Sequence, residues 1–343
     1  MAVATPKSPS SPYAELKRRV QAAGLMRPNP IYYTALVSAN LAALVAVLAL
    51  LRIVPAGWAT LLLAAGLGFV SGQLGFQLHD SGHLQMFRHR RLNLLVSFVT
   101  ANLLLGMSSG WWIDKHNRHH GNPNHVDLDP DIKVGMISYS TDQAVAKRGL
   151  HRLVAARQAY FFFPLLFGLA WAMHASSAQY VAGRRWRRSG GEMVALGVHA
   201  VAYLGLLVAL VGPWWALAVM AVHKGVGGFY MAMVFAPNHK GMPQVLEGDQ
   251  TEFLRSQVLT SRNVRSHRVT DFLYGGLNYQ IEHHLFPTMP RCNVRSAQPI
   301  VKAYCEEIGV DYYETSIVQS YREILGYLHE VGNPLRAPKA VPA

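Results

Sequence analysis

Four apolar stretches constrain this chain more than any other feature of its sequence, because each is about as long as a membrane-spanning helix. A helix needs about 20 largely apolar residues to cross the hydrocarbon core of a bilayer. The stretches form two pairs. A short break separates the two members of each pair, Pro55-Ala56-Gly57 in the first and Gly212-Pro213 in the second. The stretches run from Ile31 to Val54, from Trp58 to Leu78, from Met193 to Val211 and from Trp214 to Ala236. The sequence therefore predicts two helical hairpins in a membrane.

Composition and charge agree with a membrane location. Charged residues make up 15% of the chain, whereas soluble domains carry about 25%. The formal net charge is +13, but the basic residues flank the apolar stretches and form no single recognition element, so we expect no nucleic-acid partner. Basic flanks mark the cytoplasmic side of a membrane. They are Lys17, Arg18, Arg19 and Arg27 before the first stretch, and Arg184, Arg185, Arg187 and Arg188 before the third.

Two shorter apolar runs, about Leu92 to Met107 and about Tyr160 to Met173, lie between the hairpins. Runs of this length are typical of interfacial or re-entrant segments. If both stay on the cytoplasmic side, both basic flanks are cytoplasmic and each hairpin begins and ends there.

Sixteen histidines are many for a chain of 343 residues, and eight of them lie in four short segments. Histidines three or four residues apart lie on one face of a helix, so their rings can reach the same metal ion. Two segments are His79-Asp80-Ser81-Gly82-His83 and His116-Asn117-Arg118-His119-His120. The others are Gln280-Ile281-Glu282-His283-His284 and His239, which follows the last apolar stretch.

Eight imidazoles are too many for one tetrahedral zinc ion, which takes four ligands. They suit two metal ions, and a nitrogen-rich set without thiolates is compatible with iron, copper, nickel or zinc. The two cysteines, Cys292 and Cys305, are too few for a cysteine-based metal site or a disulfide framework. The spacing predicts a two-metal site but does not identify the metal.

The strings HDSGH, HNRHH and QIEHH resemble the three histidine boxes of the membrane fatty acid desaturase superfamily. The longer strings KHNRHHGNPNHVDLDPD and GGLNYQIEHHLFPTMPR resemble its acyl-CoA and front-end branch. The resemblance covers roughly residues 30 to 310 and implies a four-helix membrane stem, a cytosolic cap holding two irons, and O2 as co-substrate. By position, the iron ligands would be His79, His83, His116, His119, His120, His239, His283 and His284.

Residues around the boxes are expected to support these ligands. Gln280 stands where other branches of the superfamily have histidine, and the front-end branch has glutamine there too. Gln280, Asn238, Asp80 and His125 are candidates for further metal ligands or for groups that hold the ligands. Ligating histidines usually donate their second N–H to a carboxylate or carbonyl, so the acids near the boxes either serve this purpose or face solvent. These acids are Asp80, Asp114, Asp127, Asp129, Asp131 and Glu282.

The resemblance implies an enzyme that introduces a double bond into a fatty acyl chain, carried as acyl-CoA or acyl-lipid. The two-metal centre itself would be catalytic, with no separate acid or base. A hydroxylase or ketolase of the same superfamily is the alternative. A membrane transporter or metal-handling protein is more remote, because it would place polar groups at the middle of the bilayer. The His-Pro-Gly-Gly haem motif of a fused cytochrome b5 is absent from this sequence, so we expect electrons from a separate ferredoxin or cytochrome b5-like protein with its reductase.

The predicted fold class is an all-α integral membrane protein, with four transmembrane helices as two hairpins and a cytosolic helical cap that holds the two metals. Residues 1–30 are expected to form a cytosolic tail, 31–78 the first hairpin and 193–236 the second. Residues 79–192 form the cap around the first two boxes with interfacial helices, and 237–343 the cap around the third with C-terminal helices. The active site is expected on the cytoplasmic face, in a bacterial cell membrane rather than the endoplasmic reticulum.

Other residues receive simpler interpretations. His174, His199 and His223 lie within apolar runs without a companion at ligand spacing, so they are not expected to bind metal. The pair Trp111-Trp112 is expected to anchor the chain at the membrane interface, as aromatic belts do.

Overall fold

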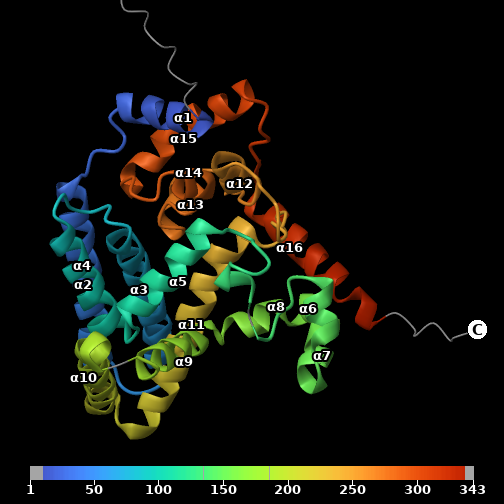
Figure 1. Ribbon diagram of the computed structural model, residues 1–343. Coiled ribbons are helices and arrows are strands. Elements are labelled where there is room, and N and C mark those ends of the chain that lie inside the picture. The colour runs from blue at the N-terminus through green and yellow to red at the C-terminus, as the bar shows by residue number, and fades with distance from the viewer. Residues whose placement is uncertain (1–10, 134, 185, 337–343) are drawn as a thin grey trace, which may run out of the picture.

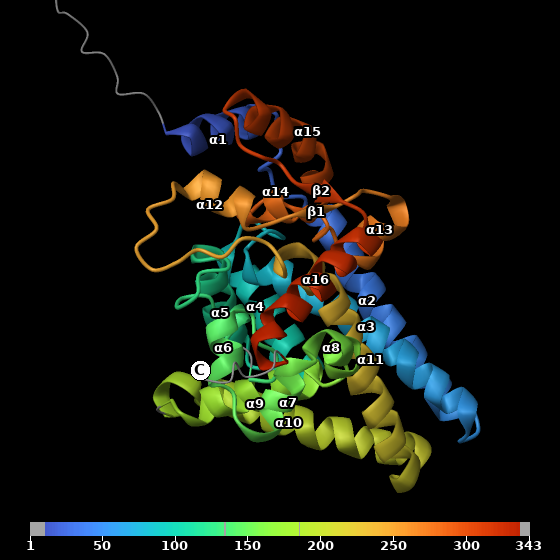
Figure 2. The same cartoon turned by 90° about the vertical axis from the view of Figure 1, so that its right-hand side faces the viewer.

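The computed structural model describes residues 11–133, 135–184 and 186–336, and these are mostly helical (Figures 1 and 2). Among these residues, four helices are long and apolar enough to cross a membrane, which confirms the predicted all-α membrane fold. They are α2 (Pro30–Ile53), α3 (Trp58–Gly82), α10 (Trp186–Val211) and α11 (Pro213–His239). In the described part of the chain, sheet structure is limited to a parallel pair of two-residue strands, β1 (Asn263–Val264) and β2 (Glu314–Thr315).

Local sequence sets where these helices begin. Proline occupies the first position of α2 and of α11, where its missing N–H costs no hydrogen bond. The Asn29 side chain also caps α2 by accepting the backbone N–H of Tyr32 at 3.1 Å. Gly212, between the helices of the second hairpin, has a φ of +80°, which favours glycine.

Helices α3 and α11 pack closely along their length and carry the ends of the two hairpins into the cap. A Cβ atom at Gly68 would lie 2.9 Å from the backbone nitrogen of Gly227, so the absence of a side chain lets the two backbones approach. Both helices run past their predicted ends. Helix α3 continues to Gly82 instead of Leu78, and α11 to His239 instead of Ala236.

Two bent helix pairs contain the shorter apolar runs. The first pair consists of α4 (Arg90–Phe98) with the π-helix η1 (Val99–Leu105), followed after a bend of 114° by α5 (Ser109–Gly121). The second pair, α8 (Gln158–Leu166) and α9 (Leu169–Ala182), is bent by 74°. Each pair has the composition of a broken span or of a re-entrant loop, so the interfacial position remains a prediction. Short elements η2 (Pro130–Ile132), α6 (Thr141–Ala146) and α7 (Gly149–Ala156) connect the pairs.

Most of the remaining helices gather at one end of the spans, as Figure 1 shows. They are α1 (Pro12–Ala22), α12 (Phe253–Leu259), α13 (Arg268–Leu273), α14 (Gln280–Leu285) and α15 (Arg291–Glu307). Helix α16 (Ile317–Val331) extends away from this group and packs on α8, and η3 (Asn333–Leu335) packs on α7. Helix α1 was expected to be part of a tail, but its Leu16 and Val20 are fully buried in a core shared with Ile281 and Val301. The Ser- and Pro-rich residues 1–10 lie outside the described residues.

Candidate metal centre

Four elements of the fold bring the eight box histidines together. Helix α3 carries His79 near its end, with His83 as its C-cap, and α11 ends at His239. Helix α5 carries three more histidines and α14 carries His283 and His284. The helices converge beneath α14 in Figure 1. The continuation of α3 and α11 into the cap therefore places His79, His83 and His239 beside the other five histidines.

The histidines form two groups rather than one. In each group the nitrogens available to a metal lie within 4.8 Å of one another. The first group is His79, His83, His116, His120 and His283, and the second is His119, His239 and His284. Adjacent residues on a helix do not share a face, and the rings of His119 and His120 are inclined by 77° to each other. The adjacent pairs His119-His120 and His283-His284 thus each supply one ring to the first group and one ring to the second.

Spacings within the first group fit a bound cation. The Nε2 atoms of His83 and His116 are 2.8 Å apart, and those of His116 and His120 are 3.1 Å apart. The Nε2 atom of His283 lies 3.0 Å from that of His79 and also 3.0 Å from that of His120. Nitrogens on one metal, each about 2.1 Å from it, would be separated by about 3.0 to 3.4 Å. Five ring nitrogens that face one another this closely are therefore arranged as a ligand set.

The second group has three rings and an amide. The Nε2 atoms of His119 and His239 are 3.3 Å apart. The Nε2 atom of His284 is buried and has no hydrogen-bond partner in the described part of the chain, which a metal ion would provide. The Gln280 amide nitrogen lies 2.9 Å from Nε2 of His239, and the Asn238 amide donates to Gln280 Oε1 at 2.9 Å. Gln280 thus borders the second group, and Asn238 holds Gln280.

The opposite ring nitrogen of several histidines has a fixed acceptor. Nδ1 of His79 lies 3.1 Å from the Asp80 carboxylate, and Nδ1 of His119 lies 3.0 Å from that of Asp129. His239 Nδ1 lies 3.1 Å from the Thr260 carbonyl oxygen, and His284 Nδ1 lies 2.9 Å from Gln257 Oε1. When Nδ1 donates its proton to these acceptors, the Nε2 lone pair is free for a metal.

Burial keeps the rings of His83, His283 and His284 neutral. It lowers the pKa of His83, His283 and His284 well below the ordinary value of 6.5, and neighbouring imidazoles lower it further. A neutral imidazole is the form that binds a metal. These three rings are therefore uncharged nitrogen donors at neutral pH.

A comparison with known proteins agrees with this geometry. The family model "Fatty acid desaturase" matches residues 56–316. The chain belongs to the fatty acid desaturase family. This confirms the resemblance drawn from the three boxes.

Relatives within the family cover most of this chain. The Acyl-lipid (9-3)-desaturase of Physcomitrium patens is 32% identical over 319 residues, which are 90% of this chain and 60% of that protein. The Delta(5) fatty acid desaturase fat-4 of Caenorhabditis elegans is 32% identical over 321 residues, 88% of this chain and 69% of that protein. The Delta(8)-fatty-acid desaturase of Euglena gracilis is 28% identical over 314 residues, 88% of this chain and 74% of that protein. The chain thus spans three-fifths of the length of the Physcomitrium patens relative.

The acidic residues near the histidine boxes differ in whether they contact the ligand histidines. Asp80 and Asp129 are buried against histidine rings, and Arg291 Nε donates to Asp80 at 2.7 Å. Asp131 lies further away, 3.6 Å from His119 Nδ1, and pairs with Lys115. The other three acids do not reach the ring nitrogens of the box histidines. Asp114 pairs with Arg118, Asp127 is exposed, and the buried Glu282 accepts from Asn263 and Tyr312.

The structure also places His125 and the pair Trp111-Trp112. His125 joins neither histidine group, and its Nδ1 accepts the backbone N–H of Asp127 at 3.2 Å. Trp111 and Trp112 are not surface anchors, because they are only 8% and 9% exposed. The Trp112 ring stacks on His116 with ring centroids 4.4 Å apart. The sequence assigned no role to Arg291, although it is the last residue of the quoted string GGLNYQIEHHLFPTMPR.

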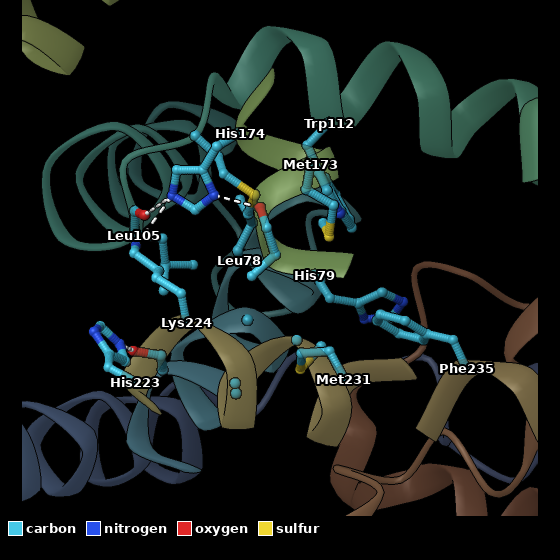
Figure 3. A pocket seen from close by; sticks show the side chains of 17 residues that line it. Leu78, His79, Leu105, Trp112, Met173, His174, His223, Lys224, Met231 and Phe235 are labelled. Carbon is cyan, nitrogen blue, oxygen red and sulfur yellow. Dashed lines mark hydrogen bonds between the residues drawn. The ribbon is translucent and has the colours of Figure 1, made fainter. Parts of the chain in front are cut away.

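An apolar pocket begins at the first histidine group and runs between the membrane helices. It encloses about 660 Å³, including its open mouth. Figure 3 shows His79 and Phe235 at one end and His174, His223 and Lys224 at the other. Between them the walls include Leu78, Met173 and Met231. A pocket with such apolar walls suits a chain-like apolar ligand.

Proposed function

We propose that this protein is an O2-dependent di-iron fatty acyl desaturase that uses electrons from an external donor. The observation that carries the proposal is the position of His79, which belongs to the first histidine group and also lines the apolar pocket. A chain in the pocket would therefore lie beside the metal-binding nitrogens. The family and the names of its relatives support a fatty acid as the substrate.

The eight histidines would hold two ions. The first group would hold one with five imidazoles, and His119, His239 and His284 would hold the other with Gln280 beside them. Five nitrogens exceed the four ligands of a structural zinc site. Removing hydrogen from an unactivated methylene also needs a redox cofactor, because side chains cannot do it alone. We therefore propose iron. When reduced, the two irons would supply the oxidant that takes two hydrogens from adjacent carbons, while O2, two electrons and two protons give two waters.

The chain's own residues would position the substrate and exclude water. Leu78, Met231 and Phe235 line the pocket near His79 and would hold methylenes against the site. Dry walls strengthen electrostatic interactions and prevent side reactions. Asp80 and Asp129 would keep the Nδ1 protons of His79 and His119 in place. The two-metal centre remains the proposed catalytic group, and no separate acid or base is assigned.

The setting of the enzyme is also part of the proposal. Basic residues before α2 and around the start of α10 support a cytoplasmic active site. We propose that the substrate is carried as acyl-CoA or acyl-lipid. We also propose that a separate ferredoxin or cytochrome b5-like protein, with its reductase, donates the electrons. The composition rich in Ala and Arg supports a bacterial cell membrane, whereas the relatives named above come from eukaryotes.

Expression in a desaturase-deficient host tests the function. We would analyse total fatty acids by mass spectrometry, with His119→Ala and His283→Ala as inactive variants and His125→Ala as the matched control. A new double bond that is lost in the first two variants and kept in the control supports the proposal. A hydroxylated product would reassign the chemistry to the related hydroxylases. No new product, despite bound iron and a supplied reductase chain, would overturn it.

A further inference from the structure

The pocket that starts at the metal centre ends at a charged group within the membrane. Lys224 lines this far end together with His174 and His223 (Figure 3). It lies 11 residues after the start of α11 at Pro213, or about 16 Å along the helix axis. That depth is near the middle of a hydrocarbon core about 30 Å thick. An ionisable group there is costly and is a functional candidate by default.

Lys224 has few partners for a buried ammonium. Its Nζ lies 3.1 Å from Nε2 of His174 and 4.9 Å from the centroid of the Tyr203 ring. Within residues 11–133, 135–184 and 186–336, no carboxylate forms an ion pair with it. An ammonium has three N–H donors, so the contact with His174 leaves donors for a further acceptor in the pocket.

The neighbouring histidines, by contrast, are already engaged. His223 contacts Ser71 Oγ at 2.8 Å and the Tyr203 hydroxyl at 2.7 Å, one with each ring nitrogen. Nδ1 of His174 lies 2.6 Å from the Ala170 carbonyl oxygen. Neither ring belongs to a metal-binding group among the described residues. Among these three side chains, Lys224 is therefore the one that can still donate hydrogen bonds to a ligand at this end of the pocket.

The distance along the pocket suits a long chain. Lys224 and Phe235 both line it and are 11 residues apart on α11, which corresponds to about 16 Å of helix rise. A terminal methyl group at the far end would accept no hydrogen bond and would bury apolar surface against a cation. A carboxylate there would pair with the ammonium through a charge-assisted hydrogen bond.

We propose that Lys224 binds a carboxylate at the end of a long apolar chain, which runs from Lys224 through the pocket towards His79. This inference rests on the proposed function and changes its substrate, because a chain that ends in a carboxylate at Lys224 is neither an ordinary acyl-CoA nor an acyl-lipid. Such a carboxylate has two sources. It belongs either to a free fatty acid or to an acyl thioester that carries a second carboxylate in place of its terminal methyl.

Binding to the purified, metal-free protein tests the inference without any turnover. The affinity of each probe would be measured by its displacement of a fluorescent fatty acid. The first pair of probes is palmitate and methyl palmitate. The second pair of probes is palmitoyl-CoA and the mono-CoA thioester of hexadecanedioic acid. We expect the charged probe of at least one pair to bind about tenfold tighter than its neutral partner. Lys224→Met should abolish that preference, whereas Lys224→Arg should retain it. Lys17→Met, which removes an exposed cation on α1, should leave it unchanged.

Each outcome has a definite meaning. A preference in the first pair alone identifies the free acid, and one in the second alone identifies the dicarboxylic thioester. Equal affinities within both pairs, or a preference that survives Lys224→Met in a variant with normal size-exclusion behaviour, would overturn the inference. If Lys224→Met does not fold, Lys224→Gln replaces it in the same comparison. A protein that shows the preference yet forms no double bond refutes only the proposed function.

Discussion

The carboxylate of Asp129 lies 3.0 Å from Nδ1 of His119, on the side of the ring opposite the second histidine group. Asp129 is fully buried and accepts the backbone N–H groups of Asn124 and Asp131, each at 2.8 Å. These bonds fix the carboxylate before any metal binds. His119 is therefore oriented by a rigid acceptor, and the loop that follows α5 acts as part of the metal centre.

We expect Asp129→Asn to weaken metal binding at the second group. The amide lacks the charge that holds the Nδ1 proton of His119, and loss of such partners typically costs about 10- to 100-fold in metal affinity or activity. Iron content after dialysis against a graded chelator would measure the change. Asp127→Asn is the matched control, because Asp127 is exposed and touches no box histidine. Equal iron loss in the two variants would contradict the assigned role.

Substitutions in the third box should separate the two ions. His283 belongs to the five-histidine group and His284 to the three-histidine group, although they are neighbours in sequence. His284→Ala leaves only two imidazoles in its group, so we expect loss of about one metal per protein. His283→Ala leaves four imidazoles and should retain more metal. Metal analysis of the purified variants would check this, and identical losses would argue against two separate sites.

The sequence predicted the fold class and the eight histidines because both depend on local patterns. Spans are visible as apolar runs, and ligand pairs such as His79 and His83 are visible as helical spacings. The assignment of His283 and His284 to different groups was not visible. It depends on the angle at which α14 meets α5 and α11, which only the packed structure determines.

Other features escaped prediction for physical reasons. Helix α1 is short, and its Leu16 and Val20 become buried only because α12, α14 and α15 share one core with them. Trp112 looked like an interfacial tryptophan because its sequence neighbours give no sign of the His116 ring on which it stacks. Likewise, Lys224 and His174 lie 50 residues apart and meet only through the packing of α9 on α11. Contacts of this kind, between residues far apart in the sequence, produce no periodic pattern from which they could be predicted.

The metal-free protein should lose stability on mild acidification. Burial lowers the pKa of His83, His283 and His284 in the folded state, while the unfolded chain keeps the ordinary value of 6.5. Below that value the unfolded state therefore binds more protons, and the free energy of unfolding falls as the pH falls. Each histidine contributes at most about 1.4 kcal/mol per pH unit.

Thermal unfolding in detergent at pH 7.5 and 5.5 would measure this effect. We expect a lower Tm at pH 5.5, with a smaller difference in His284→Ala, which has one fewer of these groups. A Tm that does not depend on pH in the metal-free protein would contradict the prediction.

Glu282 should act in the opposite direction, and its substitution isolates that contribution. It is fully buried, and its carboxylate accepts from Asn263 Nδ2 and from the Tyr312 hydroxyl, each at 2.7 Å. Burial raises the pKa of Glu282 from 4.5 to about 7, so its favourable contribution exists at low pH and is lost as the pH rises towards 7. Relative to the parent protein, Glu282→Gln should therefore gain about 2 kcal/mol between pH 5.5 and pH 8. Paired unfolding curves at both pH values would measure it, with Glu330→Gln at an exposed position as the control. A pH-independent difference between the parent and Glu282→Gln would mean that Glu282 stays ionised throughout this range despite its burial.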